Sequence, residues 1–219
     1  MNDARLTLAE EFLLLALDDE KGVVCNQPFM GLEFGLAGAV LMELSLMGKI
    51  KATPEMVEMI DENPCADEIF DDALAMIKEQ REAESARYWV WKLGIHIQEI
   101  KDYFLKRLVE KGILEKKEKN ILWILHRKCY PLVNEQVEDD VKERIRAAVF
   151  SREAPSERDV VLISLIKSCN LTELVFGNSE QKNYQERIDS ITAMDVIGQA
   201  VYQAIYEILQ KLSMQQLYY

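Results

Sequence analysis

The sequence predicts an all-α fold, forming one helical domain over residues 1–219 with one β-hairpin. Apolar side chains recur at helical spacing along most of the 219 residues. Only 9 Gly and 5 Pro interrupt the chain, and 49% of its residues are hydrophobic, which is ample material for a buried core. We find neither a repeat of fixed period nor a linker, so we expect a single domain.

The N-terminal part of the chain predicts two buried helices. Thr7 and Glu10 have the spacing of a capping box, and the stretch 12–17 that follows is apolar on most sides. A second, strongly apolar helix is expected from about residue 35 to residue 47. Gly48 is placed to end this helix, as a left-handed residue would.

Seven further helical segments follow, most of them marked by a stripe of apolar residues. The stripes are Phe70, Leu74 and Ile77 after Asp67; Trp89 within about 85–93; Ile97, Ile100, Phe104 and Leu108, ending at Gly112; Val137, Val141, Ile145 and Val149 after Asn134; Val160, Leu162, Ile163 and Ile166; a shorter amphipathic stretch between Ser179 and Ile191; and Val196, Ala200, Ala204 and Ile208. We expect Ser156 with Asp159, and Thr192 with Asp195, to cap the helices that follow them.

The segment that begins at Ile113 departs from helical periodicity and is the best candidate for a β-hairpin. Charged residues around 118–120 separate two short apolar runs, and the run Ile121–Leu125 carries strand-favouring side chains. Five successive apolar residues in a strand would face both sides of it, so one side needs cover from a subunit, a partner or a membrane. The alternative is a hairpin buried within its own domain. The flanking residues are basic, as at a lipid interface: Lys116, Lys117, Lys119, Arg127 and Lys128.

Composition limits the partners and the compartment. The net charge of −12 disfavours nucleic acid as a partner. The four widely spaced cysteines, Cys25, Cys65, Cys129 and Cys169, are expected to be reduced and mostly buried, as in a cytoplasmic protein. We find no secretory or myristoylation signal and no apolar run near the ~20 residues that span a bilayer. Any membrane contact is therefore expected to be peripheral.

No motif supports catalysis, a metal or a cofactor. His96 and His126 lack partners at metal-ligand spacing, and a structural or surface role is the simpler interpretation. No strand precedes the cluster Gly31, Gly35 and Gly38, so close helix packing explains it better than a nucleotide-binding loop. Adjacent acidic residues are interpreted as solvated helix faces. We therefore predict no catalytic residue and no enzyme.

Three segments together resemble the Golgi phosphoprotein 3 family. They are LTLAEEFLLLALDDEKG near the N-terminus, GLAGAVLMELSLMGKI, and LVEKGIL followed by the hairpin and Tyr130-Pro131-Leu132. Their order and spacing agree over nearly the whole chain. The resemblance implies a bundle core surrounded by amphipathic helices, in a peripheral membrane protein of the cytoplasmic face. Its eukaryotic members bind phosphatidylinositol 4-phosphate and the cytoplasmic tails of Golgi glycosyltransferases, and its hairpin is associated with self-association and membrane contact.

The family's lipid pocket uses a tryptophan and three arginines. The tryptophan position falls at Pro28 or Phe29, and the arginine positions fall at Ala37, Gln98 and Lys101. Only Lys101 keeps a positive charge, although a solvated helix face is the simpler interpretation of that lysine. Lysine offers a point charge where arginine offers a planar fork. The long polar N-terminal extension of eukaryotic members is also missing, from which we expect a prokaryotic source.

These observations favour a peripheral membrane-associated adaptor that binds an anionic lipid or phosphoinositide headgroup. The alternative is a protein–protein interaction module or oligomeric scaffold without lipid binding, and an unrecognised enzyme is the least favoured. Protein tails are expected as further partners, as is a homo-oligomer formed through the hairpin. The predicted contact residues are Phe29, Gln98 and Lys101 for the headgroup, and Ile121, Leu122, Trp123 and Ile124 for a membrane or oligomer contact.

Overall fold

The computed structural model describes residues 5–18, 23–24, 31–53, 55–121, 125–151, 153–177 and 181–216. Within these ranges the helices are α1 Leu8–Ala16, α2 Gly31–Leu46, α3 Glu68–Glu79, α4 Ala86–Ile95, α5 Ile97–Glu110, α6 Glu135–Phe150, α7 Glu157–Ser168, α8 Thr172–Phe176, α9 Gln181–Thr192 and α10 Val196–Gln216. Three antiparallel pairs accompany them: β1 Leu17–Asp18 with β2 Val23–Val24, β3 Ile50–Ala52 with β4 Val57–Met59, and β5 Lys117–Ile121 with β6 Leu125–Cys129. The predicted fold class is confirmed, and two short strand pairs add to the expected hairpin.

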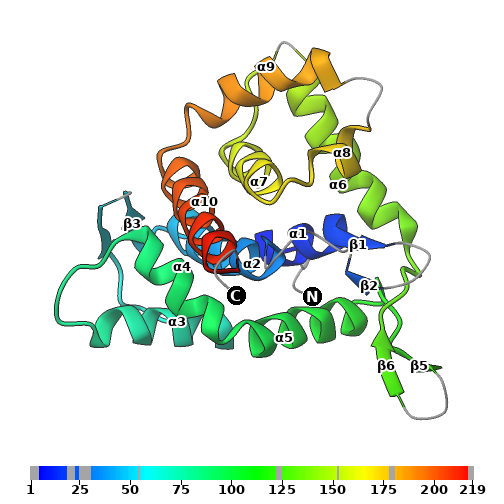
Figure 1. Ribbon diagram of the computed structural model, residues 1–219, viewed down its shortest axis with the longest axis horizontal. Coiled ribbons are helices and arrows are strands. Elements are labelled where there is room, and N and C mark those ends of the chain that lie inside the picture. Colours follow the sequence, from blue (N-terminus) through cyan, green and yellow to red (C-terminus); the bar gives the residue numbers. More distant parts are fainter. Residues whose placement is uncertain are drawn as a thin grey trace.

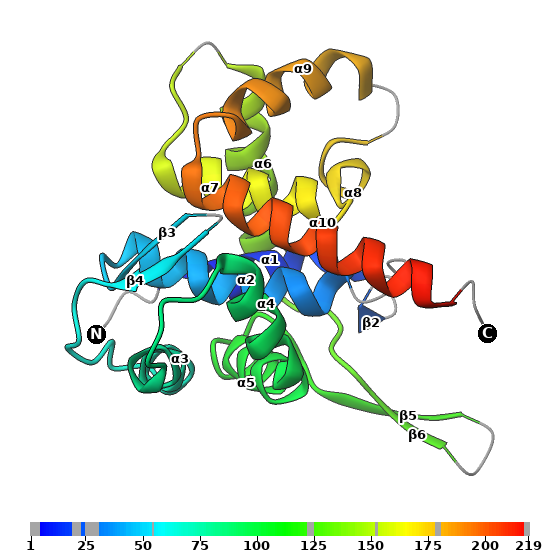
Figure 2. The same cartoon turned by 60° about the vertical axis from the view of Figure 1, so that its left-hand side comes forward.

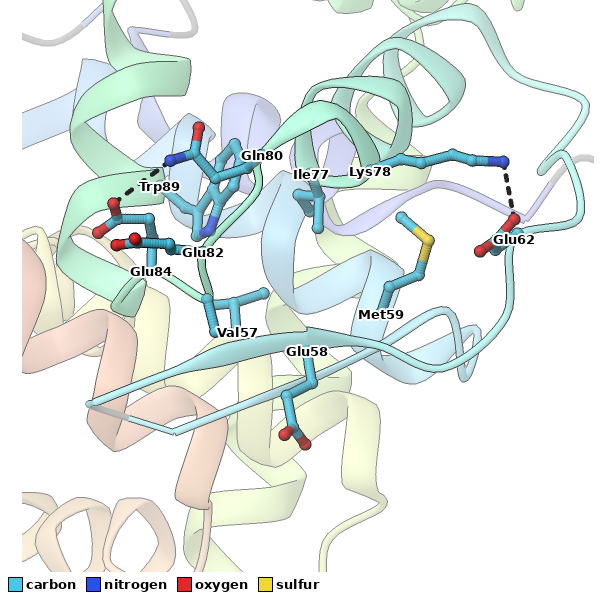
Figure 3. A pocket seen from close by; sticks show the side chains of 11 residues that line it. Val57, Glu58, Met59, Glu62, Ile77, Lys78, Gln80, Glu82, Glu84 and Trp89 are labelled. Carbon is cyan, nitrogen blue, oxygen red and sulfur yellow. Dashed lines mark hydrogen bonds and ion pairs between the residues drawn. The ribbon is translucent and has the colours of Figure 1, made fainter.

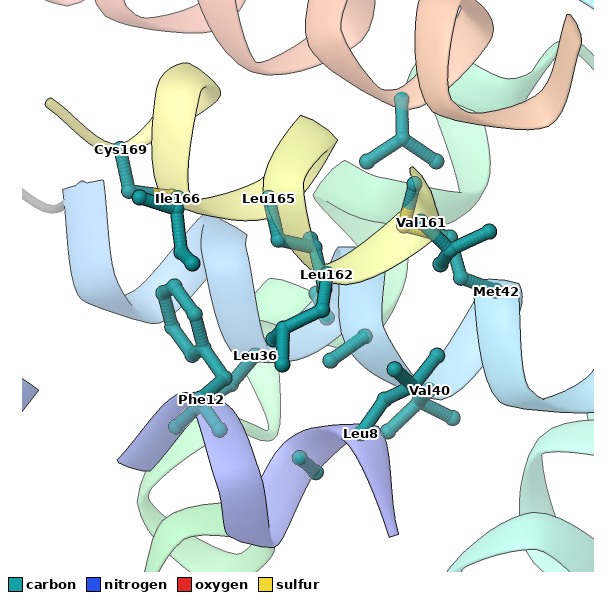
Figure 4. Packing of buried hydrophobic residues seen from close by; sticks show 14 of the residues in the cluster. Leu8, Phe12, Leu36, Val40, Met42, Val161, Leu162, Leu165, Ile166 and Cys169 are labelled. Atoms are coloured by element: carbon teal, nitrogen blue, oxygen red, sulfur yellow. The ribbon is translucent and has the colours of Figure 1, made fainter. Parts of the chain in front are cut away.

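Helices α1 and α2 form the centre of the molecule. In Figure 1 they lie between α3 to α5 below and α6 to α9 above, and α10 crosses beside them. Every residue of α1 is buried, as are most residues of α2. Figure 4 shows Phe12 of α1, Leu36 of α2 and Ile166 of α7 packed in one apolar cluster. The two apolar helices predicted near the N-terminus are therefore confirmed as the core.

Two of the three clustered glycines are sites of close helix packing. A Cβ atom at Gly35 would lie 2.4 Å from Cζ of Phe12, and a Cβ atom at Gly38 would lie 2.5 Å from Cγ1 of Val201. Both distances are far inside van der Waals contact, so α1 and α10 approach α2 only because these side chains are missing. Gly31 has no neighbour within 4 Å of such an atom, and the packing explanation is wrong for it.

Three glutamates of α1 and α2 are buried with cationic partners. Glu10 is 0% exposed and meets Nζ of Lys111 at 2.7 Å. One carboxylate oxygen of Glu43 accepts hydrogen bonds from the Leu8 N–H at 2.5 Å, and the other accepts from Nη1 of Arg158 at 2.9 Å. Glu11 meets both Arg144 and Arg158. These ion pairs connect α1 and α2 to α6, α7 and the residue that follows α5. Breaking any of them would leave an uncompensated buried charge, so they stabilise this arrangement of helices.

Three sequence-based boundaries differ from the structure. Helix α2 starts at Gly31 rather than near residue 35. Thr192 is the last residue of α9, and Asp195 alone precedes α10 and accepts hydrogen bonds from its first turn. We predicted that the charged stretch 118–120 separates two apolar runs of the hairpin, but it lies within strand β5. Ile121 and Leu125, the first and last residues of the predicted apolar run, belong to different strands and pair with each other.

Candidate lipid-contact site

The hairpin of β5 and β6 extends away from the helices. Figures 1 and 2 agree that its strands lead outward from the end of α5. At its base, Leu114 and Leu132 form a bridge, and Cys129 is buried at 1% exposure. The base is thus anchored in the core. The expectation of a hairpin buried within its own domain does not fit the described strands.

The register of this hairpin concentrates positive charge. Lys119 lies directly opposite Arg127, and Glu118 lies opposite Lys128. Between residues 116 and 128 the sequence has five cations and one glutamate, in a chain whose net charge is −12. These cations make the hairpin a candidate for contact with an anionic partner.

The base of the hairpin presents basic side chains to solvent. Lys116, Lys117 and Lys128 are exposed. Nζ of Lys117 lies 2.8 Å from a carboxylate oxygen of Glu115, and this contact raises the pKa of the lysine. Ile121 ends β5, whereas Leu122, Trp123 and Ile124 lie outside the described residues, and their predicted role stays a prediction.

The second predicted contact region is the junction of α4 and α5. Gly94 sets its geometry, because a Cβ atom there would lie 2.8 Å from the ring of Phe34 in α2. Phe34 also stacks on Trp91, with ring centroids 5.8 Å apart. Trp91 is 46% exposed and Ile95 is 67% exposed, one helical turn apart on the same face of α4. The predictions from the sequence did not include this exposed apolar pair, although its i, i+4 spacing is visible in the sequence.

Gln98 and Lys101 lie on α5, just after this pair. The Gln98 side chain donates a hydrogen bond to the Asp102 carboxylate at 2.9 Å. Lys101 is half-buried, and none of the described residues forms an ion pair with it. Asp102 and the exposed Glu99 are close in sequence on the same helix. This surface has one lysine among acidic neighbours, which is a weak match to a phosphorylated headgroup.

The remaining predicted pocket positions do not strengthen this match. Ala37 is fully buried within α2, so no side chain from that position reaches a ligand. Phe29 lies outside the described residues. The structure packs α2 against α5, which brings the two helices of the predicted pocket together. Among the described pocket positions Ala37, Gln98 and Lys101, only Lys101 is a cation.

Together, the fold and these surfaces define a mostly helical protein with a projecting hairpin that carries several basic residues. Among the residues that the structure places, no helix is both long and apolar enough to cross a membrane. The sequence matches the family described as Golgi phosphoprotein 3 (GPP34) over residues 8–208, and the chain belongs to that family.

The chain is similar to vacuolar protein sorting-associated protein 74 of Schizosaccharomyces pombe, with 27% identity over 225 residues. The match covers 87% of this chain and 65% of the relative, so the chain spans less than two thirds of that protein's length.

Proposed function

We propose that this protein is a Golgi phosphoprotein 3-like adaptor that contacts anionic lipid surfaces through the hairpin of β5 and β6. The family and the similarity to a protein named for vacuolar protein sorting support an adaptor role in membrane traffic. We infer the lipid contact from one observation: Lys119 lies opposite Arg127 in a hairpin that extends away from the helices. The buried apolar residues that the structure describes form one core cluster, which supports treating residues 1–219 as one domain.

In this proposal, general attraction to negative charge replaces tight recognition of one headgroup. Each lysine or arginine near an anionic bilayer contributes about 1 kcal/mol to binding. The hairpin supplies several such cations, whereas Lys101 is the one cation among the described positions predicted to contact a headgroup. Trp123 and its apolar neighbours would enter the interface between headgroups and acyl chains, where amphipathic aromatic rings are favoured.

Co-sedimentation with vesicles tests the proposal. We expect the wild type to bind vesicles containing phosphatidylserine and to bind phosphatidylcholine vesicles much less. The double variant Lys119→Glu and Arg127→Glu should lose at least about thirtyfold in affinity, which corresponds to ~2 kcal/mol for two cations. A control with the same charge change, Lys51→Glu and Arg81→Glu, alters exposed residues near β3 and α4, far from the hairpin. Equal loss in both variants would contradict a specific role for the hairpin.

An oligomeric scaffold is the second candidate function. A two-stranded hairpin outside a larger sheet is marginally stable by itself, which favours cover from another copy of the chain. Light scattering of the wild type and of Trp123→Asp distinguishes the two candidates. A lower mass for the variant supports the scaffold, whereas unchanged mass combined with lost vesicle binding supports the lipid contact.

A further inference from the structure

Concave surfaces also lie on parts of the described chain away from the hairpin. An acidic pocket of about 520 Å³ lies between β4, α3 and the start of α4, and four glutamates and one lysine are among its described lining residues. Figure 3 shows Val57 facing Ile77 across this pocket and Lys78 paired with Glu62. A smaller pocket of about 290 Å³, here called the α7–α10 pocket, lies between α7, α9 and α10. Its volume is near the lower limit for ligand sites, which suits a single ring.

One side of the α7–α10 pocket holds a partly exposed ion pair. Nζ of Lys167 in α7 lies 2.8 Å from a carboxylate oxygen of Asp189 in α9 and donates to the Thr192 hydroxyl at 3.1 Å. The hydrogen bond from Lys167 lowers the pKa of Asp189, so this carboxylate is ionised at neutral pH. The Gln185 amide donates to the same oxygen, and no described residue donates to the second one. The pocket therefore offers an open carboxylate oxygen beside an ammonium group that has a third N–H.

The other side of the pocket is formed by α10 and carries an aromatic ring. Tyr202 is 36% exposed, and Nζ of Lys167 lies 5.5 Å from the centre of its ring. The ring of Tyr206 stacks beside it, with centroids 6.2 Å apart. Gln199, one turn earlier on α10, donates its amide to the Ala193 carbonyl at 2.6 Å, and no described residue donates to its amide oxygen. Tyr202 and Gln199 thus add an apolar face and a hydrogen-bond acceptor to the pocket.

Buried polar groups beneath these side chains fix the shape of the pocket. Ser164 is 2% exposed, and its hydroxyl oxygen lies 3.1 Å from a carboxylate oxygen of Asp195. A Cβ atom at Gly198 would lie 1.8 Å from that carboxylate and 2.6 Å from the hydroxyl, so only glycine leaves room for this contact. Because these groups already bond to each other, a ligand need not reorganise them, which lowers the cost of binding.

We propose that the α7–α10 pocket binds one ring of a carbohydrate through two neighbouring hydroxyl groups. A hydroxyl group donates one hydrogen bond and also accepts, so it can bridge a carboxylate and an ammonium group. One hydroxyl would donate to the open oxygen of Asp189 and accept from Lys167, and the other would donate to the amide oxygen of Gln199. The C–H face of the sugar ring would lie on Tyr202, whose apolar body and polar tip suit such a half-polar ligand.

Charge balance favours this neutral ligand over a charged one. Lys167 and Asp189 already neutralise each other, so a zwitterion would give up its hydration for charges that have partners. A pair of hydroxyl groups bridges Lys167 and Asp189 without separating them, and removing a hydroxyl from water costs less than removing an ion. Binding of a carbohydrate here needs neither the hairpin nor a lipid, so its failure would leave the proposed lipid contact unaffected.

NMR titration of the isotope-labelled full chain with the methyl glycosides of glucose, galactose and mannose tests this proposal. We expect at least one glycoside to give saturable shifts of the backbone amides that line the pocket, without vesicles. Tetrahydropyranyl methanol has the same ring but one hydroxyl group, and it should bind at least about tenfold more weakly, because a hydrogen bond to a charged group is lost. Equal binding of this compound, or binding of none of the glycosides, would overturn the proposal. Shifts with glycine alone would identify a zwitterion site and would overturn it as well.

Two variants locate the binding in the α7–α10 pocket. Asp189→Asn should weaken glycoside binding at least about tenfold, because a charge-assisted hydrogen bond is lost. The matched control is Asp140→Asn, because Asp140 also accepts from a glutamine four residues earlier but lies on α6, outside this pocket. This control should bind as the wild type does. Tyr202→Ala removes the aromatic face without changing the charge and should also weaken binding. Wild-type affinity in either variant, with an unchanged circular dichroism spectrum, would contradict the site.

Discussion

Replacing Glu43 by leucine should destabilise the fold strongly, because Glu43 joins three helices. Its carboxylate accepts from the Leu8 N–H at the start of α1 and from Arg158 of α7 at 2.9 Å. Glu43 is 7% exposed, and so is Arg158. Removing one partner of such a buried pair typically costs about 3–5 kcal/mol. Arg158 keeps Glu11 and the Leu6 carbonyl as acceptors, so we expect the lower end, about 3 kcal/mol.

Urea unfolding followed by circular dichroism measures this loss as a lower midpoint with an unchanged slope. The matched control is Glu99→Leu, because the Glu99 side chain is 81% exposed and its ion-pair partner among the described residues is the exposed His96. That variant should change stability by less than about 0.5 kcal/mol. The double variant Glu43→Leu and Arg158→Met removes both charges, so its loss should be smaller than the sum of the single losses. Strict additivity, or a Glu43→Leu variant as stable as the control, would refute the argument.

Three further predictions concern packing, titration and reactivity. Gly38→Ala should destabilise the protein by about 1–3 kcal/mol in a thermal melt, whereas Gly31→Ala, which meets no neighbour, should not; equal melting temperatures would contradict the close approach. Burial raises the pKa of Asp195 above its ordinary value of 3.8, so the folded state holds this proton more tightly than the unfolded state. As the pH falls from 7 through the raised folded pKa, the wild type should therefore gain stability relative to Asp195→Asn, and the gain is complete below 3.8. Urea melts at several pH values measure the stability difference between the two proteins. A difference that does not change with pH would refute this prediction. Burial also raises the pKa of the Cys169 thiol, so mass mapping after iodoacetamide treatment at pH 8 should show Cys65 modified before Cys169, and the reverse order would exclude the buried position.

The helical fold was predictable because burial follows local periodicity. The stripe of Phe70, Leu74 and Ile77 is buried as its spacing indicates. The capping box of Thr7 and Glu10 is present with both of its hydrogen bonds. Such features depend on residues three or four positions apart, and that is the range over which a sequence pattern is informative.

The buried glutamates could not be predicted in the same way. In the sequence Glu43 interrupts an apolar run, and its partner Arg158 lies 115 residues further along the chain. Only the tertiary fold brings these side chains together. A lone glutamate inside an otherwise apolar helix is nevertheless a signal, because a charge is buried only with a partner.

The contact surfaces were predictable in part. The basic residues around the hairpin were visible in the sequence, but the register that places Lys119 opposite Arg127 was not. The apolar run from Ile121 to Leu125 suggested one strand, whereas its first and last residues belong to two different strands that pair with each other. The acidic pocket was missed altogether, because it combines residues from β4, α3, α4 and the loop between those helices.

Quenching of tryptophan emission by phosphatidylserine vesicles with brominated acyl chains measures whether the hairpin enters the lipid. We predict quenching of the wild type that disappears in Trp123→Phe and persists in Trp91→Phe. Trp91 provides the comparison because it is 46% exposed and lies on α4. Absence of quenching, or quenching that survives Trp123→Phe, would contradict the contact between the hairpin and the lipid.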